Sequence, residues 1–281
     1  MAILVTGATG NVGRNVVDLL GKTGAEIRAT SRTPERANLP AGVAVHGGDL
    51  AHPETFADAL KGVDKVFLFP EPSGVAGFIE VAKNAGVERV VLLSSLAASM
   101  PDPQSNPIAM MHLVVEQALE HSGLDWTFVR PGAFAANTLQ WAPSIRAGEP
   151  VRIPYADSAG SPIHERDIAE VAVRALLDEG HASAKYEITG PEAISQRRQA
   201  ELIGAAIGRA VQVDSLTGDK ARALVVEQFG GYGPPELVDT LFALMQDPAP
   251  AVVTDTVQRV TGHPAHSYAD WVNDHKATFG G

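Results

Sequence analysis

The stretch Ala2-Ile3-Leu4-Val5-Thr6-Gly7-Ala8-Thr9-Gly10-Asn11-Val12-Gly13 begins one residue into the chain and decides its fold. Its first four residues form an apolar run typical of a buried parallel strand. Apolar residues then recur at helical spacing after Asn11, which predicts an amphipathic helix from that point. Because three evenly spaced glycines connect the two elements, the stretch predicts a strand, a glycine-rich turn and a helix in direct succession.

The three glycines have separate roles in such a turn. Gly7 permits the tight turn out of the strand, Gly10 lets a diphosphate approach the backbone, and Gly13 lets the helix pack closely on the strand. The helix N-terminus adds free N–H groups and the positive end of the helix dipole. We therefore predict a dinucleotide site, with an ordinary turn as the alternative. The cofactor contacts expected in this stretch are Gly7, Thr9, Gly10, Asn11, Val12 and Gly13.

Length and composition limit the class of protein. A chain of 281 residues fits one large α/β domain or a nucleotide domain with a smaller cap. The absence of cysteine excludes disulfides, thiolate catalysis and zinc–cysteine sites. A net charge of −11 disfavours nucleic-acid binding, and no apolar run is long enough for a membrane span. With no basic segment at the N-terminus to suggest a signal peptide, we expect a cytoplasmic protein that is a monomer or a homodimer.

The end of the second strand indicates which nicotinamide cofactor binds. Glu26–Thr30 is the expected strand, and Ser31-Arg32 follows it about 20 residues after the glycine turn. A carboxylate at this position would bind the ribose 2′-hydroxyl of NAD, whereas an arginine suits the 2′-phosphate of NADP. Ser31 and Arg32 therefore favour NADP(H) over NAD(H). The alternative is that Arg32 is only a solvated loop residue.

Further apolar runs alternate with helical segments, which predicts a Rossmann-type, doubly wound parallel sheet. The expected strands are 43–46, 65–69, 89–93 and 125–129, with helices over 53–61, 75–85 and 109–121 between them. Ligands of such sheets bind outside the carboxyl ends of the strands. We accordingly place Asp49 and Leu50 beside the adenine and Phe69 and Pro70 beside the nicotinamide ribose. Ser94 and Pro131 are two further cofactor contacts expected at strand ends, although Ser94 is equally read as an ordinary strand-end hydroxyl.

The strand and helix alternation loosens after residue 130. We predict a dinucleotide-binding domain over 1–132 and a smaller α/β substrate lobe over 133–281, with some return of the chain to the first sheet. A strand over 185–189 and helices over 167–177 and 195–208 are expected in this half. The stretch from Phe229 to Pro235 is either a lid over the substrate or a plain surface connection. The candidates for the substrate wall are Phe134, Asn137, Trp141 and Tyr155.

Two histidine-containing stretches could indicate metal binding or acid–base chemistry. His263 and His266 are separated by Pro264, so no regular helix presents them as a ligand pair, and no carboxylate cluster is evident beside them. We therefore expect no metal site. In the stretch 164–167, Glu165 and Asp167 are explained by the preference for carboxylates at a helix N-terminus.

Taken together, these motifs resemble the NmrA-like branch of the atypical short-chain dehydrogenases/reductases over nearly the whole chain. The residues that carry the resemblance are the glycine turn 7–13, Ser31-Arg32, Gly48-Asp49, Glu116, the stretch 126–132, Asn137 and Asp167-Ile168-Ala169. The resemblance implies a Rossmann domain with a small substrate lobe and an NADP(H) site. Members of this family include reductases of quinones and of triphenylmethane dyes, and also regulators that sense the cofactor without a reaction of their own.

One departure from the wider superfamily bears on mechanism. Its carbonyl reductases place Tyr-x-x-x-Lys on the helix after the fifth strand, but if His112 occupies the lysine position, Ile108 stands in place of the tyrosine. No tyrosine occurs between residues 1 and 154, so the usual acid for an alkoxide is missing. His112 is then a candidate to bind the nicotinamide ribose or to donate a proton. The alternative is a purely structural hydrogen bond.

These observations lead to a reductase that transfers hydride from NADPH to a small, largely apolar acceptor. A quinone, an imine or a conjugated system needs little acid assistance, so orientation by the protein and chemistry by the cofactor suffice. The main alternative is a non-catalytic NADP(H) sensor that binds a protein partner. An isomerase or lyase that uses the cofactor only structurally is a third possibility.

Overall fold

The computed structural model describes residues 1–229, 235–248 and 250–281. These residues form two compact units. The first unit comprises Met1–Pro131, Glu165–Ile188 and Thr256–His263, and the second comprises Gly132–His164, Thr189–Asp255 and Pro264–Gly281. Among the described residues, no helix combines the length and the apolar character that crossing a bilayer requires.

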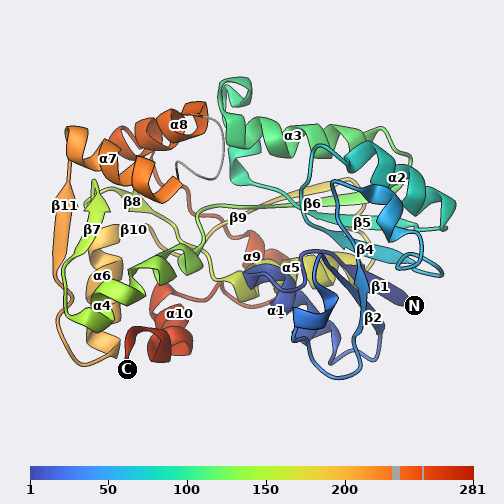
Figure 1. Cartoon of the computed structure of the whole chain (residues 1–281), viewed down its shortest axis with the longest axis horizontal. Helices are drawn as coiled ribbons and strands as arrows, with labels where there is room; N and C mark the ends of the chain where they lie inside the picture. The colour runs from blue at the N-terminus through green and yellow to red at the C-terminus, as the bar shows by residue number, and fades with distance from the viewer. Residues whose placement is uncertain (230–234, 249) are drawn as a thin grey trace. The chain divides into compact units, whose positions relative to one another are not determined.

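A seven-stranded sheet organises the first unit within the described part of the chain (Figure 1). All neighbouring strands pair in parallel. In order across the sheet the strands are β3 (Ala44–Gly47), β2 (Glu26–Ser31), β1 (Ala2–Val5), β4 (Lys65–Leu68), β5 (Arg89–Leu93), β6 (Asp125–Pro131) and β9 (Ala184–Ile188). The strand order reverses between β1 and β4, where open α/β sheets bind their ligands. The predicted fold class is confirmed.

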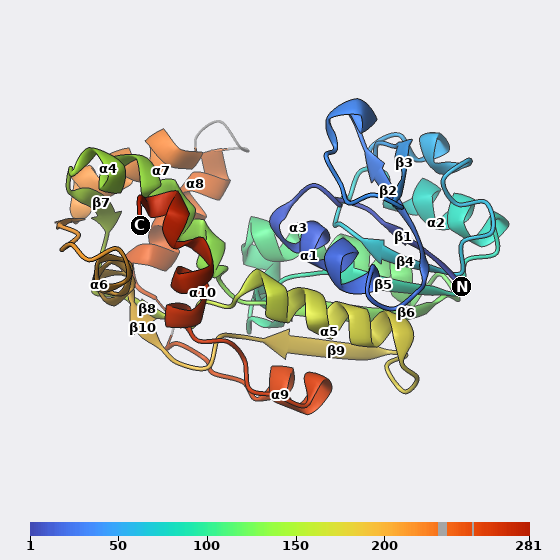
Figure 2. The ribbon, with the colours of Figure 1, turned by 90° about the horizontal axis from the view of Figure 1, so that it is seen from below.

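Helices cover both faces of this sheet. On one face α1 (Asn11–Leu20) packs against α5 (Glu165–Leu177), and Figure 2 shows α9 (Thr256–Thr261) beside α5 and β9. On the other face α2 (Val75–Asn84) and α3 (Pro107–Glu120) enclose an apolar core with strands β1, β4, β5 and β6. Fully buried members of this core include Leu4, Phe56, Phe78, Leu92 and Phe128. The central strands β1, β4 and β5 are buried at every position and mostly apolar, because both of their faces are covered.

One predicted helix of the first unit is wrong. Only the short 3₁₀ helix Pro53–Phe56 forms in the segment 53–61, and turns follow it. The backbone N–H of Leu60 still donates to the carbonyl of Phe56, and both side chains are buried. A segment this short forms few helical hydrogen bonds to offset the cost of starting a helix. Tertiary burial of Phe56 and Leu60 therefore decides its conformation.

The second unit combines short strands with helices around its own core (Figure 1). Its helices are α4 (Ala142–Ala147), α6 (Gln196–Ala206), α7 (Gly218–Phe229), α8 (Pro235–Gln246) and α10 (Tyr268–His275), and the 3₁₀ helix Ala135–Trp141 precedes α4. Strands β7 (Val151–Pro154) and β11 (Val213–Leu216) pair in parallel, and β8 (Ala159–Gly160) pairs antiparallel with β10 (Ile194–Ser195). The buried aromatic residues Tyr268, Trp271 and Phe279 anchor the core. Most of the stretch considered as a lid, residues 230–234, lies outside the described residues.

Candidate cofactor and acceptor sites

The glycine turn has the backbone geometry that its sequence predicts. Gly7 has a φ of +60°, which side chains other than glycine rarely adopt, and its carbonyl accepts the N–H of Gly10 at 3.0 Å. A Cβ on Gly13 would lie 2.2 Å from the carbonyl oxygen of Gly7. Glycine is therefore required at position 13 for α1 to begin directly against the turn.

The start of α1 is prepared for an anion. Its N-cap is Gly10, which offers no side-chain acceptor, and its first turn contains no carboxylate. Four N–H groups at a helix N-terminus have no partner within the helix, and together with the helix dipole they attract phosphate. These residues therefore fit the diphosphate of a dinucleotide.

A cavity of about 420 Å³ lies at this turn, entirely within the first unit. It is lined by Thr6, Gly7, Thr9, Gly10, Thr30, Ser31, Arg32, Thr33, Gly48, Asp49, Leu50, Phe56, Phe69 and Glu71. Eight of the predicted cofactor contacts come together here: Gly7, Thr9, Gly10, Ser31, Arg32, Asp49, Leu50 and Phe69. The other predicted contacts, which are Asn11, Val12, Gly13, Pro70, Ser94 and Pro131, do not line this cavity.

Arg32 is the one cation in that lining. Its side chain is exposed and makes no hydrogen bond or ion pair with any residue that the structure describes. The two acidic residues of the lining have local partners: Glu71 accepts the N–H and the hydroxyl of Ser73 at 3.0 and 2.7 Å, and Asp49 accepts the N–H of Ala51 at 3.1 Å. The guanidinium of Arg32 is thus available to an anionic ligand.

Several lining residues were missed by the sequence reasoning. Thr6 fixes the ends of two strands, since its hydroxyl donates to the carbonyl of Phe67 and accepts the N–H of Phe69. Gly48 lets the loop after β3 approach Thr30, whose Cγ2 would lie 3.0 Å from an added Cβ. The sequence could have indicated Thr6 as a lining residue, because it lies between the end of a strand and the glycine turn.

A buried ion pair lies beneath the end of β5. Glu116 on α3 and Arg130 on β6 form two hydrogen bonds, Nε to Oε1 at 2.9 Å and Nη2 to Oε2 at 2.5 Å. Ser94 donates its hydroxyl to the same carboxylate, and Arg130 also donates to the hydroxyl of Ser99. Ser94, Glu116 and Arg130 are each less than a tenth exposed. Because this network uses the hydroxyl of Ser94, a cofactor contact of that residue stays a prediction.

His112 projects from the buried face of α3, one turn before Glu116. Its Nδ1 is buried and has no hydrogen-bond partner in the described structure. Burial lowers the pKa of His112 to about 4, against an opposing effect of the nearby carboxylate of Glu116. The imidazole is therefore neutral at neutral pH. Nδ1 does not form the structural hydrogen bond that is the alternative role of this residue.

A second cavity, of about 560 Å³, lies entirely within the second unit. It is lined by Ala133, Phe134, Ala136, Asn137, Thr138, Gln140, Trp141, Ser158, Ala159, Gly160, Pro162, Gln196, Gln199, Phe229, Leu241, Leu244, Met245 and Pro248. The predicted substrate residues Phe134, Asn137 and Trp141 are among them. This size and this apolar character are typical of small-molecule sites.

Tyr155, the fourth predicted substrate residue, does not line the cavity. Its hydroxyl accepts the N–H of Gly218 at 3.2 Å, and its ring lies 6.2 Å from that of Phe242. No local pattern relates α6, α7 and α8 to the predicted wall, because these helices begin 41 residues or more after Tyr155. Only their apolar faces hinted at a shared core.

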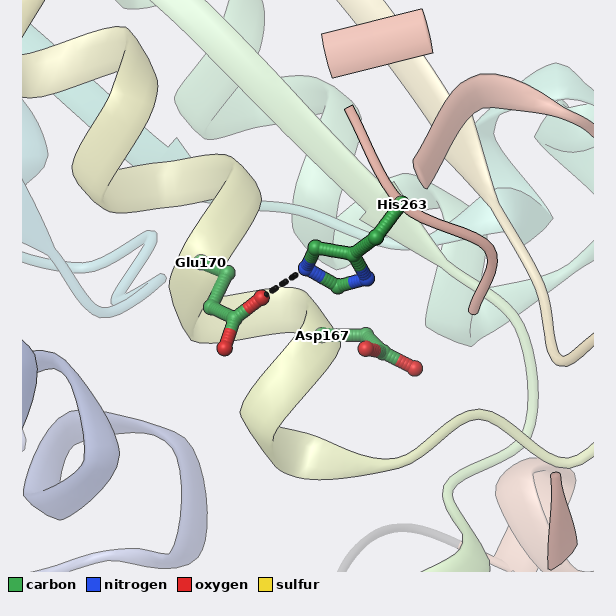
Figure 3. Close-up of side chains that lie close together, drawn as sticks. All are labelled: Asp167, Glu170 and His263. Carbon is green, nitrogen blue, oxygen red and sulfur yellow. Dashed lines mark hydrogen bonds and ion pairs between the residues drawn. The ribbon is translucent and has the colours of Figure 1, made fainter. Parts of the chain in front are cut away.

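Figure 3 shows a further cluster in the first unit, where Asp167 and Glu170 of α5 lie near His263. The expectation that no carboxylates accompany His263 is wrong, because α5 and the segment after α9 meet in the fold. Nε2 of His263 lies 2.6 Å from Oε2 of Glu170, and Arg166 donates to the other oxygen at 3.0 Å. Burial alone would raise the pKa of Glu170, but these hydrogen bonds hold it below its usual value. Glu170 thus links Arg166 of its own helix to His263 in the segment after α9.

Comparison with known proteins agrees with this geometry. Residues 7–179, more than half of the chain, match the model of a family described as NAD(P)H-binding. The chain is 38% identical to a (4-alkanoyl-5-oxo-2,5-dihydrofuran-3-yl)methyl phosphate reductase of Streptomyces griseus and 38% identical to an NAD(P)H azoreductase of Xenophilus azovorans. Each alignment covers 99% of both chains. The solved structure of an NADPH-dependent quinone oxidoreductase of Escherichia coli, complexed with NADPH, is 25% identical and superimposes with a TM-score of 0.75 over 97% of this chain and 99% of that one.

The chain therefore belongs to the NAD(P)H-binding family and is an oxidoreductase of the atypical short-chain dehydrogenase/reductase type. The family resemblance drawn from the sequence is confirmed.

Proposed function

We propose that this protein is an NADPH-dependent reductase that transfers hydride to a small, largely apolar acceptor such as a quinone, an imine or a conjugated system. The proposal is carried by the uncapped N-terminus of α1, which suits an anion and lies at the same cavity as Arg32. The second unit holds a separate, largely apolar cavity. Nucleotide and acceptor are thus assigned to two cavities with different linings.

The preference for NADPH over NADH is supported by the charge of the first cavity. Arg32 is its one cation, and a guanidinium pairs with a phosphate through two parallel hydrogen bonds. Neither Asp49 nor Glu71 is at the position of a carboxylate that binds the ribose 2′-hydroxyl, since that position follows β2. Arg32 is accordingly the residue that we assign to the 2′-phosphate.

When bound, the dihydronicotinamide supplies the hydride, and the chain supplies binding and orientation. The backbone N–H groups at the start of α1 hold the diphosphate, and Thr6 keeps the ends of β1 and β4 together below it. We assign Nδ1 of His112 to a ribose hydroxyl, because a ligand there would satisfy a buried nitrogen that otherwise has no partner.

Proton supply restricts the acceptor. Hydride transfer adds two electrons and one hydrogen nucleus, and a second proton must come from an acid or from water. A phenol is absent from residues 1–154, and the low pKa of His112 keeps its imidazole neutral at neutral pH. Acceptors whose hydride adduct is a stabilised anion, such as the monoanion of a quinol or an enolate, are protonated by water without such help, and a protonated imine gives a neutral amine directly. Simple ketones are not.

The names of the relatives are consistent with this acceptor class. They describe an azoreductase, a quinone oxidoreductase and a reductase of a (4-alkanoyl-5-oxo-2,5-dihydrofuran-3-yl)methyl phosphate. All three acceptors are conjugated systems, and the last one also carries a phosphate group. We propose that the present chain acts on the same broad class.

The test is NADPH oxidation by the purified protein with a panel of neutral quinones, azo compounds, enones and imines, followed by identification of the reduced product. We expect turnover with at least one conjugated acceptor and none with a simple aliphatic ketone. Tight NADPH binding without turnover on any member of the panel would contradict the proposal and favour the sensor.

A further inference from the structure

One polar side chain in the wall of the second cavity stands apart from the others. Gln199 is only 6% exposed, yet it makes no hydrogen bond with any residue that the structure describes. By contrast, the hydroxyl of Thr138 is satisfied by the carbonyl of Ala135 and the hydroxyl of Tyr268. The amide of Gln199 therefore offers a donor and an acceptor to whatever fills the cavity.

The start of α6 determines where this amide lies. Ser195 caps the helix by accepting the N–H of Arg198, so the register of the first turn is defined. Gln199 then falls on the buried face with Ala200 and Ile203. The amide makes no hydrogen bond with the protein, so a ligand that accepts its N–H would supply the missing partner.

The rest of the wall selects for neutral ligands. Aromatic and aliphatic side chains dominate it, and none of the described residues that line the cavity carries a charge. A phosphate or sulfonate placed here would lose its hydration without gaining a cation, which is strongly unfavourable. Aromatic rings of Phe134, Trp141 and Phe229 suit a flat, conjugated ligand.

We propose that Gln199 is the specificity residue of this cavity: its amide N–H donates to an oxygen of a neutral, planar acceptor, and the uncharged wall rejects acceptors that carry an anionic group. The inference rests on the proposed function in taking the ligand to be the acceptor. It goes further in assigning the hydrogen-bond donor and the charge of the substrate.

The test measures binding without cofactor, so that it does not depend on turnover. Calorimetric titration of the purified protein compares 1,4-naphthoquinone with 1,4-naphthoquinone-2-sulfonate, which differ by one anionic group. We expect the neutral quinone to bind at least about tenfold more tightly, the equivalent of about 1.4 kcal/mol. Equal binding of the two quinones, or tighter binding of the sulfonate, would overturn the proposal.

Two variants examine Gln199 itself. Gln199→Met keeps the volume of the side chain but removes the donor, and we expect it to weaken binding of the neutral quinone about tenfold. Gln199→Lys places a cation in the wall and is expected to shift the preference toward the sulfonate. Gln212→Met is the matched control, because Gln212 is exposed in the same unit and does not line the cavity. Unchanged binding in a folded Gln199→Met variant would contradict the assignment.

NADPH oxidation with the same two quinones separates this inference from the proposed function. Turnover of both quinones at equal efficiency, unaffected by Gln199→Met, would leave the reductase intact and eliminate the specificity role. Selective binding without any turnover would support the specificity role of Gln199 and contradict the proposed reductase.

Discussion

The two cavities of this protein are built in different ways. The cavity at β1 and α1 is formed mainly by backbone groups and short side chains from a few strand ends, and its key segment is continuous in sequence. The cavity of the second unit is formed by side chains from many separate segments between Ala133 and Pro248. We expect the diphosphate part of the first cavity to depend on a backbone geometry that few substitutions preserve, whereas the second cavity can change its ligand by changing single side chains. Because of this difference, we expect proteins with this fold to share the cofactor and to differ in the acceptor.

The largest effect is expected where the backbone itself forms the site. Gly13→Ala would place a Cβ 2.2 Å from the carbonyl oxygen of Gly7, so the turn or the helix must move. We expect the dissociation constant of NADPH to rise more than about a hundredfold, since a shift of the order of 1 Å in a binding group has such consequences. Gly47→Ala is the control, because its nearest neighbour would lie at an ordinary contact distance of 3.9 Å. Calorimetric titration of both variants with NADPH measures the difference, and equal affinities would show that the backbone turn is not the diphosphate site.

The buried ion pair of the first unit should have the next largest effect, on stability. Glu116→Ala leaves the guanidinium of Arg130 buried without its carboxylate, and such a loss typically costs 3–5 kcal/mol, so we expect about 3 kcal/mol or more. Glu120→Ala on the same helix removes only the partner of Lys185 in a more exposed pair, for which we expect less than about 1 kcal/mol. Urea unfolding gives both values. Similar losses in the two variants would mean that the buried network is not a structural anchor.

Arg32→Ala tests the charge of the nucleotide cavity. We expect affinity for NADPH to fall about tenfold to a hundredfold, as for the loss of one or two charge-assisted hydrogen bonds, with little change for NADH. Arg36→Ala is the matched control, because Arg36 is also exposed, at the end of the 3₁₀ helix Pro34–Arg36, but does not line the cavity. Fluorescence titration with both cofactors provides the comparison. An unchanged NADPH preference in Arg32→Ala would assign the 2′-phosphate to another group.

A moderate effect is expected from His112 as pH falls. Its folded-state pKa of about 4 lies below the ordinary 6.5, so the unfolded chain takes up a proton first. As the pH falls from about 6.5 to about 4, the free energy of unfolding therefore decreases progressively, by about 3 kcal/mol in total. Below about pH 4 this histidine causes no further change. His112→Ala should flatten the pH dependence of unfolding in that window. His121→Ala, an exposed position near the end of the same helix, should leave it unchanged. If His112→Ala kept the wild-type dependence of the free energy of unfolding on pH, the low pKa of His112 would be contradicted.

The smallest effect is expected for Tyr155→Phe. Its hydroxyl meets only the exposed N–H of Gly218, and its ring is outside the cavity lining. We expect the KM for the quinone acceptor to stay within about twofold of the wild-type value, because removing a contact that water replaces costs little. Steady-state kinetics measures it. A large rise in KM would return Tyr155 to the substrate wall.

The same difference between the cavities explains what the sequence predicted. The turn from Gly7 to Gly13, the doubly wound parallel sheet and the placement of Arg32, Asp49 and Phe69 follow from local patterns and from the rule that ligands lie at strand carboxyl ends. Phe134 and Trp141 line the second cavity, as predicted from their place in the segment after β6; their contact with a substrate stays a prediction. Gln199 and the α8 residues were missed, because nothing local relates positions 134, 199 and 241, and only the packing of the second unit brings them together. The failed helix over 53–61 has the same origin, since burial of Phe56 and Leu60 overrode a helical pattern.

The most direct measurement for this account is the crystal structure of the protein soaked with NADP⁺ and 1,4-naphthoquinone. The account predicts the diphosphate on the N–H groups at the start of α1, the 2′-phosphate on Arg32 and a quinone oxygen within hydrogen-bond distance of the amide of Gln199. A diphosphate bound away from α1 would contradict the central claim.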